Sequence, residues 1–421
     1  MYASRIGRRH FVMVVAITAV GAALALLGAR AAAQPPAPSI APVKIAIIVP
    51  LSGPWARQGQ VMEVAARMAV EHINRDGGIA SLGGALLELV VFDAGDSVER
   101  AKNAAQRLVA EHRDLVGATG AYLSSFTLAV SEVTERAELP LVTFSYSDLI
   151  TSRGFEYIFQ SSATGVRQAE ESLPILLDLA ASAGAKRPTR VGIVMDSTAA
   201  SVAFVKPIKE GGILGKSNLA LVVDETFTPP LANATPLIQR VRAARPDLFL
   251  LLPTAVSDTK LLIEKMNEFG LGRGRLPTVS NGGAMGDPDL GANVSPDLLE
   301  GMMSVVANWG VRGQEQLAEE FKQRTGQPWL VQHALCAYGH VQILKAGLEL
   351  AGQRDRRALG AALHEIDVTD GPAAFFPGGR VRFDEQGRRI DATLLVIQWQ
   401  NGVPVTIYPP EAAVAAPLWP K

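Results

Sequence analysis

The segment Val43-Lys44-Ile45-Ala46-Ile47-Ile48-Val49 decides the fold. Its run of β-branched and other apolar residues predicts a strand that is buried on both faces, as in a parallel sheet covered by helices. An amphipathic helical repeat follows and ends at Asp76-Gly77-Gly78, where glycines tolerate a left-handed turn. A second strand is expected at 86–92. Strand, helix and strand in this order predict a parallel sheet with a right-handed crossover.

The same alternation continues through the chain. It restarts after Tyr157-Ile158-Phe159-Gln160, which predicts a second α/β unit, and a strand at 302–308 leads back toward the first. We therefore expect an α/β protein made of two doubly wound, Rossmann-like lobes. The further strands are expected at 115–119, 141–144, 190–195, 219–223, 247–252 and 277–280, with a final hairpin of 393–400 and 403–408; the further helices are expected after Ser97 to 111, after Ser124 or Ser125 to 140, and at 168–183, 204–210, 258–269, 333–350 and 357–365.

Length and charge narrow the class of protein. A chain of 421 residues that is 48% hydrophobic can bury two cores of ordinary size. Forty basic and 41 acidic side chains give a net charge of −1, so nucleic acid and anionic membranes are not expected as partners. The single cysteine, Cys336, cannot form an internal disulfide. Packing must therefore stabilise the fold.

The first residues predict export. Arg5, Arg8 and Arg9 precede an apolar run from 11 to 27, and Ala31-Ala32-Ala33 suits cleavage, so residues 1–33 are expected to be a signal peptide and 34–42 a proline-rich linker. The arginine pair also fits a twin-arginine signal, and a retained membrane anchor is the alternative. No cysteine stands at the cleavage point to carry a lipid. The expected compartment is the periplasm.

Two motifs carry a resemblance to a known family. Ile48-Val49-Pro50-Leu51-Ser52-Gly53-Pro54 and Ile73-Asn74-Arg75-Asp76-Gly77-Gly78-Ile79 resemble the opening of the leucine/isoleucine/valine-binding proteins. Further similarity covers nearly the whole mature chain: 120–127, 139–151, 190–196 and 300–302. The resemblance implies a type I periplasmic binding protein, whose two lobes are joined by a three-segment hinge and close on the ligand.

The family places the two lobes on interleaved segments. We expect the first lobe to comprise 43–160 and 304–372, and the second 161–303 and 373–421. A protein of this kind receives a small molecule and delivers it to an ABC permease and ATPase complex in the inner membrane. A monomer without catalytic residues, cofactor or metal is expected.

In open parallel sheets, ligands bind beyond the carboxyl ends of the strands. In the first lobe, Tyr122, Ser124 and Ser125 stand directly before a helix, where hydroxyls and free amides can bind a ligand carboxylate. The alternative is that one of these serines only caps the helix. The family resemblance implies ligand contacts at the next loop and near the first strand; the candidates there are Ser145, Tyr146, Ser147, Trp55 and Gln58. Trp55 is equally consistent with ordinary packing.

The second lobe departs from the family pattern. The family's amino-acid binders have an acidic residue after the strand at 277–280, whereas this chain has Asn281-Gly282-Gly283-Ala284. The candidate contacts are polar but uncharged: Ser197, Thr198, Thr254 and Asn281. Asp196, Asp258 or Asp287 could compensate, although the first ends a strand and the others are expected to cap helices. The predicted ligand is therefore branched-chain amino acid-like, or a carboxylate or amide without a required ammonium group.

Other classes of function have weaker support. There is no nucleophile elbow, no phosphate loop and no Cys-x-x-Cys pair. His333, Cys336 and His340 share roughly one helix face, as metal ligands can, but a packed helix with Cys336 as a buried apolar residue explains them better. A sensory receptor that signals to a partner protein stays open as the alternative to transport, and a hydrolase on this fold ranks last.

Overall fold

The computed structural model describes residues 40–310 and 313–419. The predicted signal peptide, 1–33, and most of the predicted linker, 34–42, lie outside this part of the chain. Within the described residues, no helix combines the length and the apolar character that crossing a membrane requires.

The first sheet contains five parallel strands in the order β2-β1-β3-β4-β5. Strand β1 is almost entirely buried, as its apolar sequence predicts. Late helices cover this sheet together with early ones, because α13 packs along α2 and α14 against β3. The elements are β1 (Val43–Val49), β2 (Leu87–Asp93), β3 (Leu115–Gly120), β4 (Leu141–Thr143) and β5 (Ile158–Gln160), with α2 (Ala56–Arg75), α3 (Val98–Glu111), α4 (Ser124–Arg136), α13 (Gln332–Ala351) and α14 (Arg356–Glu365).

The second sheet contains seven strands in the order β14-β13-β10-β9-β8-β6-β7. Five of these strands are parallel, and the terminal hairpin adds β13 antiparallel to β10. The elements are β6 (Arg190–Asp196), β7 (Ala220–Phe227), β8 (Leu248–Leu252), β9 (Thr278–Asn281), β10 (Met303–Val306), β13 (Leu395–Gln400) and β14 (Val403–Tyr408), with α5 (Gly165–Ser182), α6 (Ala199–Glu210), α7 (Ile213–Lys216), α8 (Thr235–Ala244), α9 (Val256–Glu268), α10 (Pro288–Asn293) and α11 (Pro296–Leu299).

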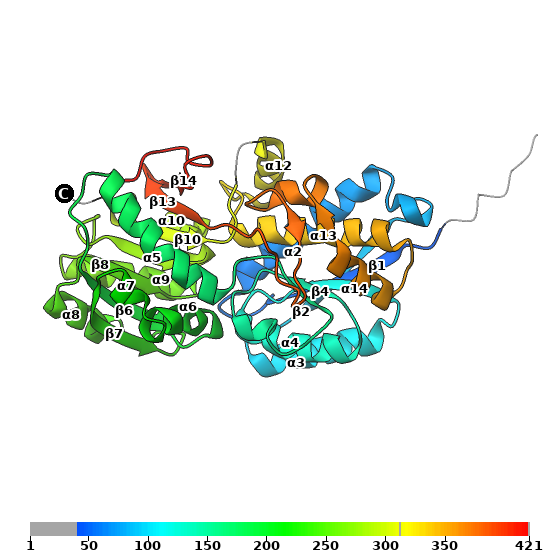
Figure 1. The fold of residues 1–421 in the computed structure, drawn as a ribbon, viewed down its shortest axis with the longest axis horizontal. Helices are drawn as coiled ribbons and strands as arrows, with labels where there is room; N and C mark the ends of the chain where they lie inside the picture. The colour runs from blue at the N-terminus through cyan, green and yellow to red at the C-terminus, as the bar shows by residue number, and fades with distance from the viewer. Residues whose placement is uncertain (1–39, 311–312, 420–421) are drawn as a thin grey trace, which may run out of the picture. The chain divides into compact units, whose positions relative to one another are not determined.

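The chain passes between the two sheets three times: after β5, after β10, and before β13. Figure 1 shows the consequence, since the orange helices α13 and α14 lie with the blue helix α2 and strand β1, while the red strands β13 and β14 lie beside the yellow strand β10. The remaining elements are α12 (Glu315–Thr325), the short antiparallel pair β11 (Asp367–Val368) and β12 (Val381–Arg382), and the 3-10 turns η1 (Ala80–Leu82), η2 (Asp148–Ile150), η3 (Gly283–Gly286) and η4 (Gly371–Phe375). The residue limits of the two lobes stay a prediction, because the largest apolar cluster combines residues of both sheets, including Val306 and Ile397.

Most predicted strands and helices are present, with changed ends. The predicted cap of α3 is confirmed, since Ser97 Oγ accepts a hydrogen bond from the Arg100 amide at 3.3 Å. The predicted cap of α4 is wrong: Leu123 holds that position, and neither serine caps the helix. Helix α6 begins at Ala199, five residues before the expected start. Helices α7, α8, α11 and α12 were not expected.

Candidate functional site

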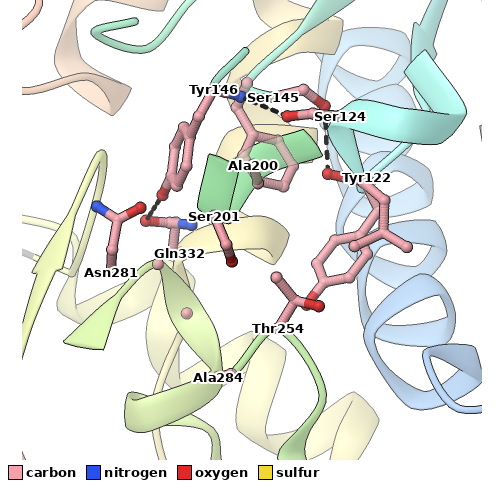
Figure 2. A pocket seen from close by; sticks show the side chains of 14 residues that line it. Tyr122, Ser124, Ser145, Tyr146, Ala200, Ser201, Thr254, Asn281, Ala284 and Gln332 are labelled. Carbon is pink, nitrogen blue, oxygen red and sulfur yellow. Dashed lines mark hydrogen bonds between the residues drawn. The ribbon is translucent and has the colours of Figure 1, made fainter. Parts of the chain in front are cut away.

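A pocket lies where the carboxyl ends of both sheets meet. Its walls come from the segments that follow β3, β4, β6, β8 and β9, and from the start of α13 (Figure 2). This is the place at which an open parallel sheet is expected to bind a ligand. The lining residues are Tyr122, Leu123, Ser124, Phe144, Ser145, Tyr146, Ala200, Ser201, Thr254, Asn281, Gly282, Gly283, Ala284 and Gln332.

The hydroxyl group of Ser124 is free to donate a hydrogen bond to a ligand. Its Oγ accepts the backbone amides of Tyr146 and Ser147 at 3.0 and 3.2 Å, which occupies both acceptor positions of the hydroxyl oxygen. The hydroxyl hydrogen therefore remains to be donated. The first intrahelical bond of α4 runs from the Thr127 amide to the Leu123 carbonyl, so the three amides before Thr127 precede the helical ladder. A hydroxyl donor at a helix N-terminus favours an anionic ligand group.

The backbone around Tyr122 is unusually constrained. Gly120 has φ +142°, and a Cβ there would lie 2.0 Å from the Ile48 carbonyl oxygen, so only glycine allows β3 to end this close to β1. Tyr122 itself has φ 73°, a left-handed conformation that a bulky side chain rarely adopts. Ser145 holds this turn, since its Oγ donates to the Tyr122 carbonyl at 3.2 Å and lies 2.7 Å from Thr127 Oγ1. This hydrogen bond holds the backbone of Tyr122, whose side chain lines the pocket.

Tyr146 forms the wall between the first sheet and β9. Its hydroxyl donates to Gln332 Oε1 at 2.9 Å, and the same oxygen accepts the Ala307 amide at 2.8 Å. A Cβ at Gly282 would lie 3.5 Å from the tyrosine ring, so this ring covers the loop after β9. Because the hydroxyl is engaged, Tyr146 presents an apolar ring face to the pocket. Figure 2 shows the tyrosine and Gln332 joined beside Asn281.

The carboxylate of Asp196, in the second lobe, accepts hydrogen bonds from the segments that follow β6 and β8. Oδ1 accepts the amide and hydroxyl of Thr198 at 3.0 and 2.7 Å, and Oδ2 accepts the amide and hydroxyl of Thr254 at 2.7 Å each. Four hydrogen bonds keep this buried charge stable without a ligand cation. Asn281 donates through Nδ2 to Gln168 Oε1 at 2.7 Å. Both residues therefore position loops, and of the two only Asn281 lines the pocket.

The structure brings together part of the predicted site. Tyr122, Ser124, Ser145, Tyr146, Thr254 and Asn281 line the pocket, whereas Trp55, Gln58, Ser125, Ser147, Ser197 and Thr198 do not. Trp55 packs edge-to-face on Phe126 at 5.7 Å, and Gln58 Nε2 donates to Asp287 Oδ2 at 3.0 Å. Ser125 is half-buried and Ser197 exposed. Ser147 is buried, with its amide bonded to Ser124.

The other two acids also have structural partners. Asp287 caps α10 through the Asp289 amide, as predicted, and burial raises the pKa of its carboxyl to about 6. Asp258 does not cap α9, since Ala255 holds that position; its Oδ1 accepts the Leu231 amide at 3.1 Å. Neither acid lines the pocket.

Every residue that lines the pocket is uncharged. The lining nevertheless includes the first residue of α4 and of α13 and two residues in the first turn of α6, so three helix N-termini meet there. Helix N-termini carry partial positive charge and exposed amides. These termini favour a negative ligand group, and no lining residue offers a carboxylate to an ammonium group. Behind the lining, the carboxylates of Asp287 and Asp196 add to burial in raising the pKa of the Tyr122 hydroxyl.

Sequence reasoning missed several lining residues. Gln332 was missed because the predicted helix began one residue later, and no local pattern connects it with Tyr146, which lies 186 residues away in the sequence. Ala200 and Ser201 were missed because α6 starts earlier than its apolar repeat indicated, so its first turn and not the preceding loop borders the pocket. The signal that could have found them is the Thr198 position, an ordinary N-cap residue.

Comparison with known proteins agrees with this geometry. A family model described as periplasmic binding protein matches residues 42–403. The chain belongs to the periplasmic binding protein family. A Leu/Ile/Val-binding protein homolog 8 of Brucella melitensis is 25% identical over 391 residues, which cover 90% of this chain and 93% of the relative.

Solved structures show the type I fold of this periplasmic binding protein. A leucine-binding protein from Thermotoga maritima superposes with a TM-score of 0.73 at 18% identity, covering 86% of this chain and 97% of that one. A solute-binding protein of an ABC transporter from R. palustris, solved in complex with benzoate, gives a TM-score of 0.73 at 16% identity, covering 90% and 99%. The two doubly wound lobes and the three-segment hinge are thus those of the family.

Two of the three residues considered as metal ligands on α13, His340 and Cys336, are buried and contact other protein groups. His340 is bonded through Nδ1 to Thr119 Oγ1 and through Nε2 to Ser161 Oγ, both at 2.8 Å. Cys336 is buried, and burial raises the pKa of its thiol to about 12. No group of three metal-ligating side chains occurs in the part of the chain that the structure describes.

Proposed function

We propose that this periplasmic binding protein captures a small carboxylate that lacks an obligatory ammonium group and delivers it to an ABC importer. The observation that carries the proposal is the uncharged pocket at which three helix N-termini converge. An α-ammonium group in this pocket would lose its water without gaining a carboxylate partner, which is costly. A carboxylate at Ser124 would gain a hydroxyl donor and helix amides.

The aromatic walls support the size and character of this ligand. Tyr122, Phe144 and Tyr146 line the pocket, and the hydroxyl of Tyr146 is engaged with Gln332. These rings suit a flat or branched apolar body attached to the carboxylate. The benzoate complex of the R. palustris protein shows that one member of this fold accepts such a molecule.

Location and mode of action belong to the same proposal. The family and the basic-apolar start of the sequence support export to the periplasm, and names of similar proteins as ABC transporter components support delivery to a permease. Binding without turnover is expected. Recovery of the bound carboxylate unchanged after long incubation, measured by NMR, tests that part.

The ligand class is tested with a matched pair. Leucine and 4-methylpentanoate share the carboxylate and the branched carbon skeleton and differ in the ammonium group; benzoate is the aromatic probe. We expect calorimetry to give 4-methylpentanoate or benzoate the lower Kd and the larger thermal shift. A Kd for leucine at least tenfold below those of both carboxylates would overturn the proposal.

A further inference from the structure

Two hydroxyl side chains that line the pocket on the side of the second sheet, Ser201 and Thr254, donate their hydrogens to the protein. Ser201 Oγ donates to the Leu252 carbonyl at 3.1 Å, and Thr254 Oγ1 donates to Asp196 Oδ2 at 2.7 Å. Neither a carbonyl nor a carboxylate oxygen can donate in return, so each hydroxyl keeps only lone pairs for a ligand. At these two places the wall can accept a hydrogen bond from a ligand and cannot donate one.

Asn281, at the end of β9, has the same polarity. Its Nδ2 donates to Gln168 Oε1 at 2.7 Å, and Gln168 Nε2 donates to a backbone carbonyl, which fixes the orientation of both amides and leaves Asn281 Oδ1 as an acceptor. The N-terminus of α6 on this side already has an anionic partner, since Asp196 Oδ1 accepts the Thr198 amide at 3.0 Å. A ligand carboxylate is therefore better placed at α4 than at α6.

The side of the first sheet offers donors. The Ser124 hydroxyl has its hydrogen to donate, because its oxygen already accepts two backbone amides. Gln332 Oε1 likewise accepts two hydrogen bonds from the protein, so its Nε2 is left to donate. Figure 2 shows Ser124 across the pocket from Ser201 and Thr254. The pocket thus has a donating end and an accepting end.

We infer that Ser201 and Thr254 are specificity-determining residues, whose oxygens accept a hydrogen bond from a neutral donor group at the end of the ligand remote from its carboxylate. This inference rests on the proposed function and names the ligand more closely. A second carboxylate would bring lone pairs against lone pairs, and an ammonium group would find no lining carboxylate. The ligand class is therefore a small monocarboxylate that carries a hydroxyl group or an uncharged amino group.

Matched probes test the donor directly. On a benzoate ring, a hydroxyl group and a fluorine are similar in size and both carry lone pairs, but only the hydroxyl can donate. We expect calorimetry on the full chain to give 3-hydroxybenzoate or 4-hydroxybenzoate a Kd about fivefold or more below that of the fluorobenzoate with the same ring position. Ser201→Ala and Thr254→Val should each lower this preference, and the double variant should abolish it. Thr254→Ser keeps the hydroxyl and should retain the preference.

Thr198→Val is the matched control, because Thr198 Oγ1 donates to the same carboxylate at the same distance, 2.7 Å, but does not line the pocket. Thr198→Val and Thr254→Val should lower Tm without ligand by similar amounts, and only Thr254→Val should lower the preference. The inference is overturned if the wild type binds hydroxybenzoates and fluorobenzoates equally, if the Ser201 and Thr254 variants keep the preference, or if Thr198→Val loses it. Binding of benzoate without any preference leaves the proposed function standing. If none of the carboxylates binds, the proposed function itself fails, and the assignment of Ser201 and Thr254 fails with it.

Discussion

Replacing Ser124 with alanine should weaken both the fold and ligand binding. The hydroxyl oxygen accepts the amides of Tyr146 and Ser147, and both of these residues are buried. Each unsatisfied buried amide costs about 1–3 kcal/mol, and water in the pocket can reach part of the loop, so we expect the free energy of unfolding to fall by about 2–4 kcal/mol. Loss of a charge-assisted donor should also raise the Kd for a carboxylate such as benzoate by roughly tenfold or more.

Ser125→Ala provides the matched control for this prediction. Ser125 is adjacent, half-buried and outside the pocket lining, and its side chain makes no hydrogen bond within the described residues. Urea unfolding without ligand, followed by circular dichroism, measures the stability change, and calorimetry with benzoate measures affinity. If both alanine variants unfold within about 0.5 kcal/mol of wild type, the hydroxyl does not hold the loop after β4, and the donor role assigned to Ser124 is wrong.

Three further perturbations test other buried groups. The folded-state pKa of Asp287 is raised to about 6, so its acid form favours folding at low pH and the free energy of unfolding should fall as pH rises from about 4 to 6; Asp287→Asn, measured by urea unfolding at pH 4.5 and 7.5, should flatten this dependence. Cys336 should react with a thiol reagent only after unfolding, because it is buried and its thiol pKa is raised to about 12; rapid labelling of the native protein would contradict this. Arg389→Met should lower stability by about 2–4 kcal/mol, since the buried guanidinium donates to the carbonyls of Ser161, Pro377 and Arg380; a Tm equal to that of wild type would contradict it.

The fold was largely predictable because its signals are local. Strand β1 and helix α3 follow directly from an apolar run and from a serine cap with its helical repeat. Helix α12 was not predictable in this way, because its only buried residue is Phe321 and its apolar stripe is correspondingly weak. The early start of α6 was missed for a related reason, since its first residues, Ala199 and Ala200, carry no periodic signal.

Sequence patterns identified some residues of the site within single loops but not the contacts between distant segments. The loops after β3 and β4 contained Ser124 and Tyr146, and both line the pocket. The hydrogen bonds that give these side chains their roles connect distant segments, as Tyr146 with Gln332 shows, and no sequence spacing reveals them. The prediction that a serine caps α4 was wrong for the same reason. The Ser124 hydroxyl oxygen accepts the amides of Tyr146 and Ser147 in the loop after β4 and does not cap its own helix.

Gln58 is a predicted ligand contact that the structure places in a contact between the two sheets. It was expected to contact ligand, yet it donates to Asp287, which follows β9 of the second sheet, and the neighbouring Arg57 lies 3.8 Å from Asp289. These protein contacts join the two lobes directly. A ligand stabilises the closed arrangement only through its difference in affinity between closed and open forms. The contacts of Gln58 with Asp287 and of Arg57 with Asp289 therefore add to any contacts that a ligand makes with both sheets.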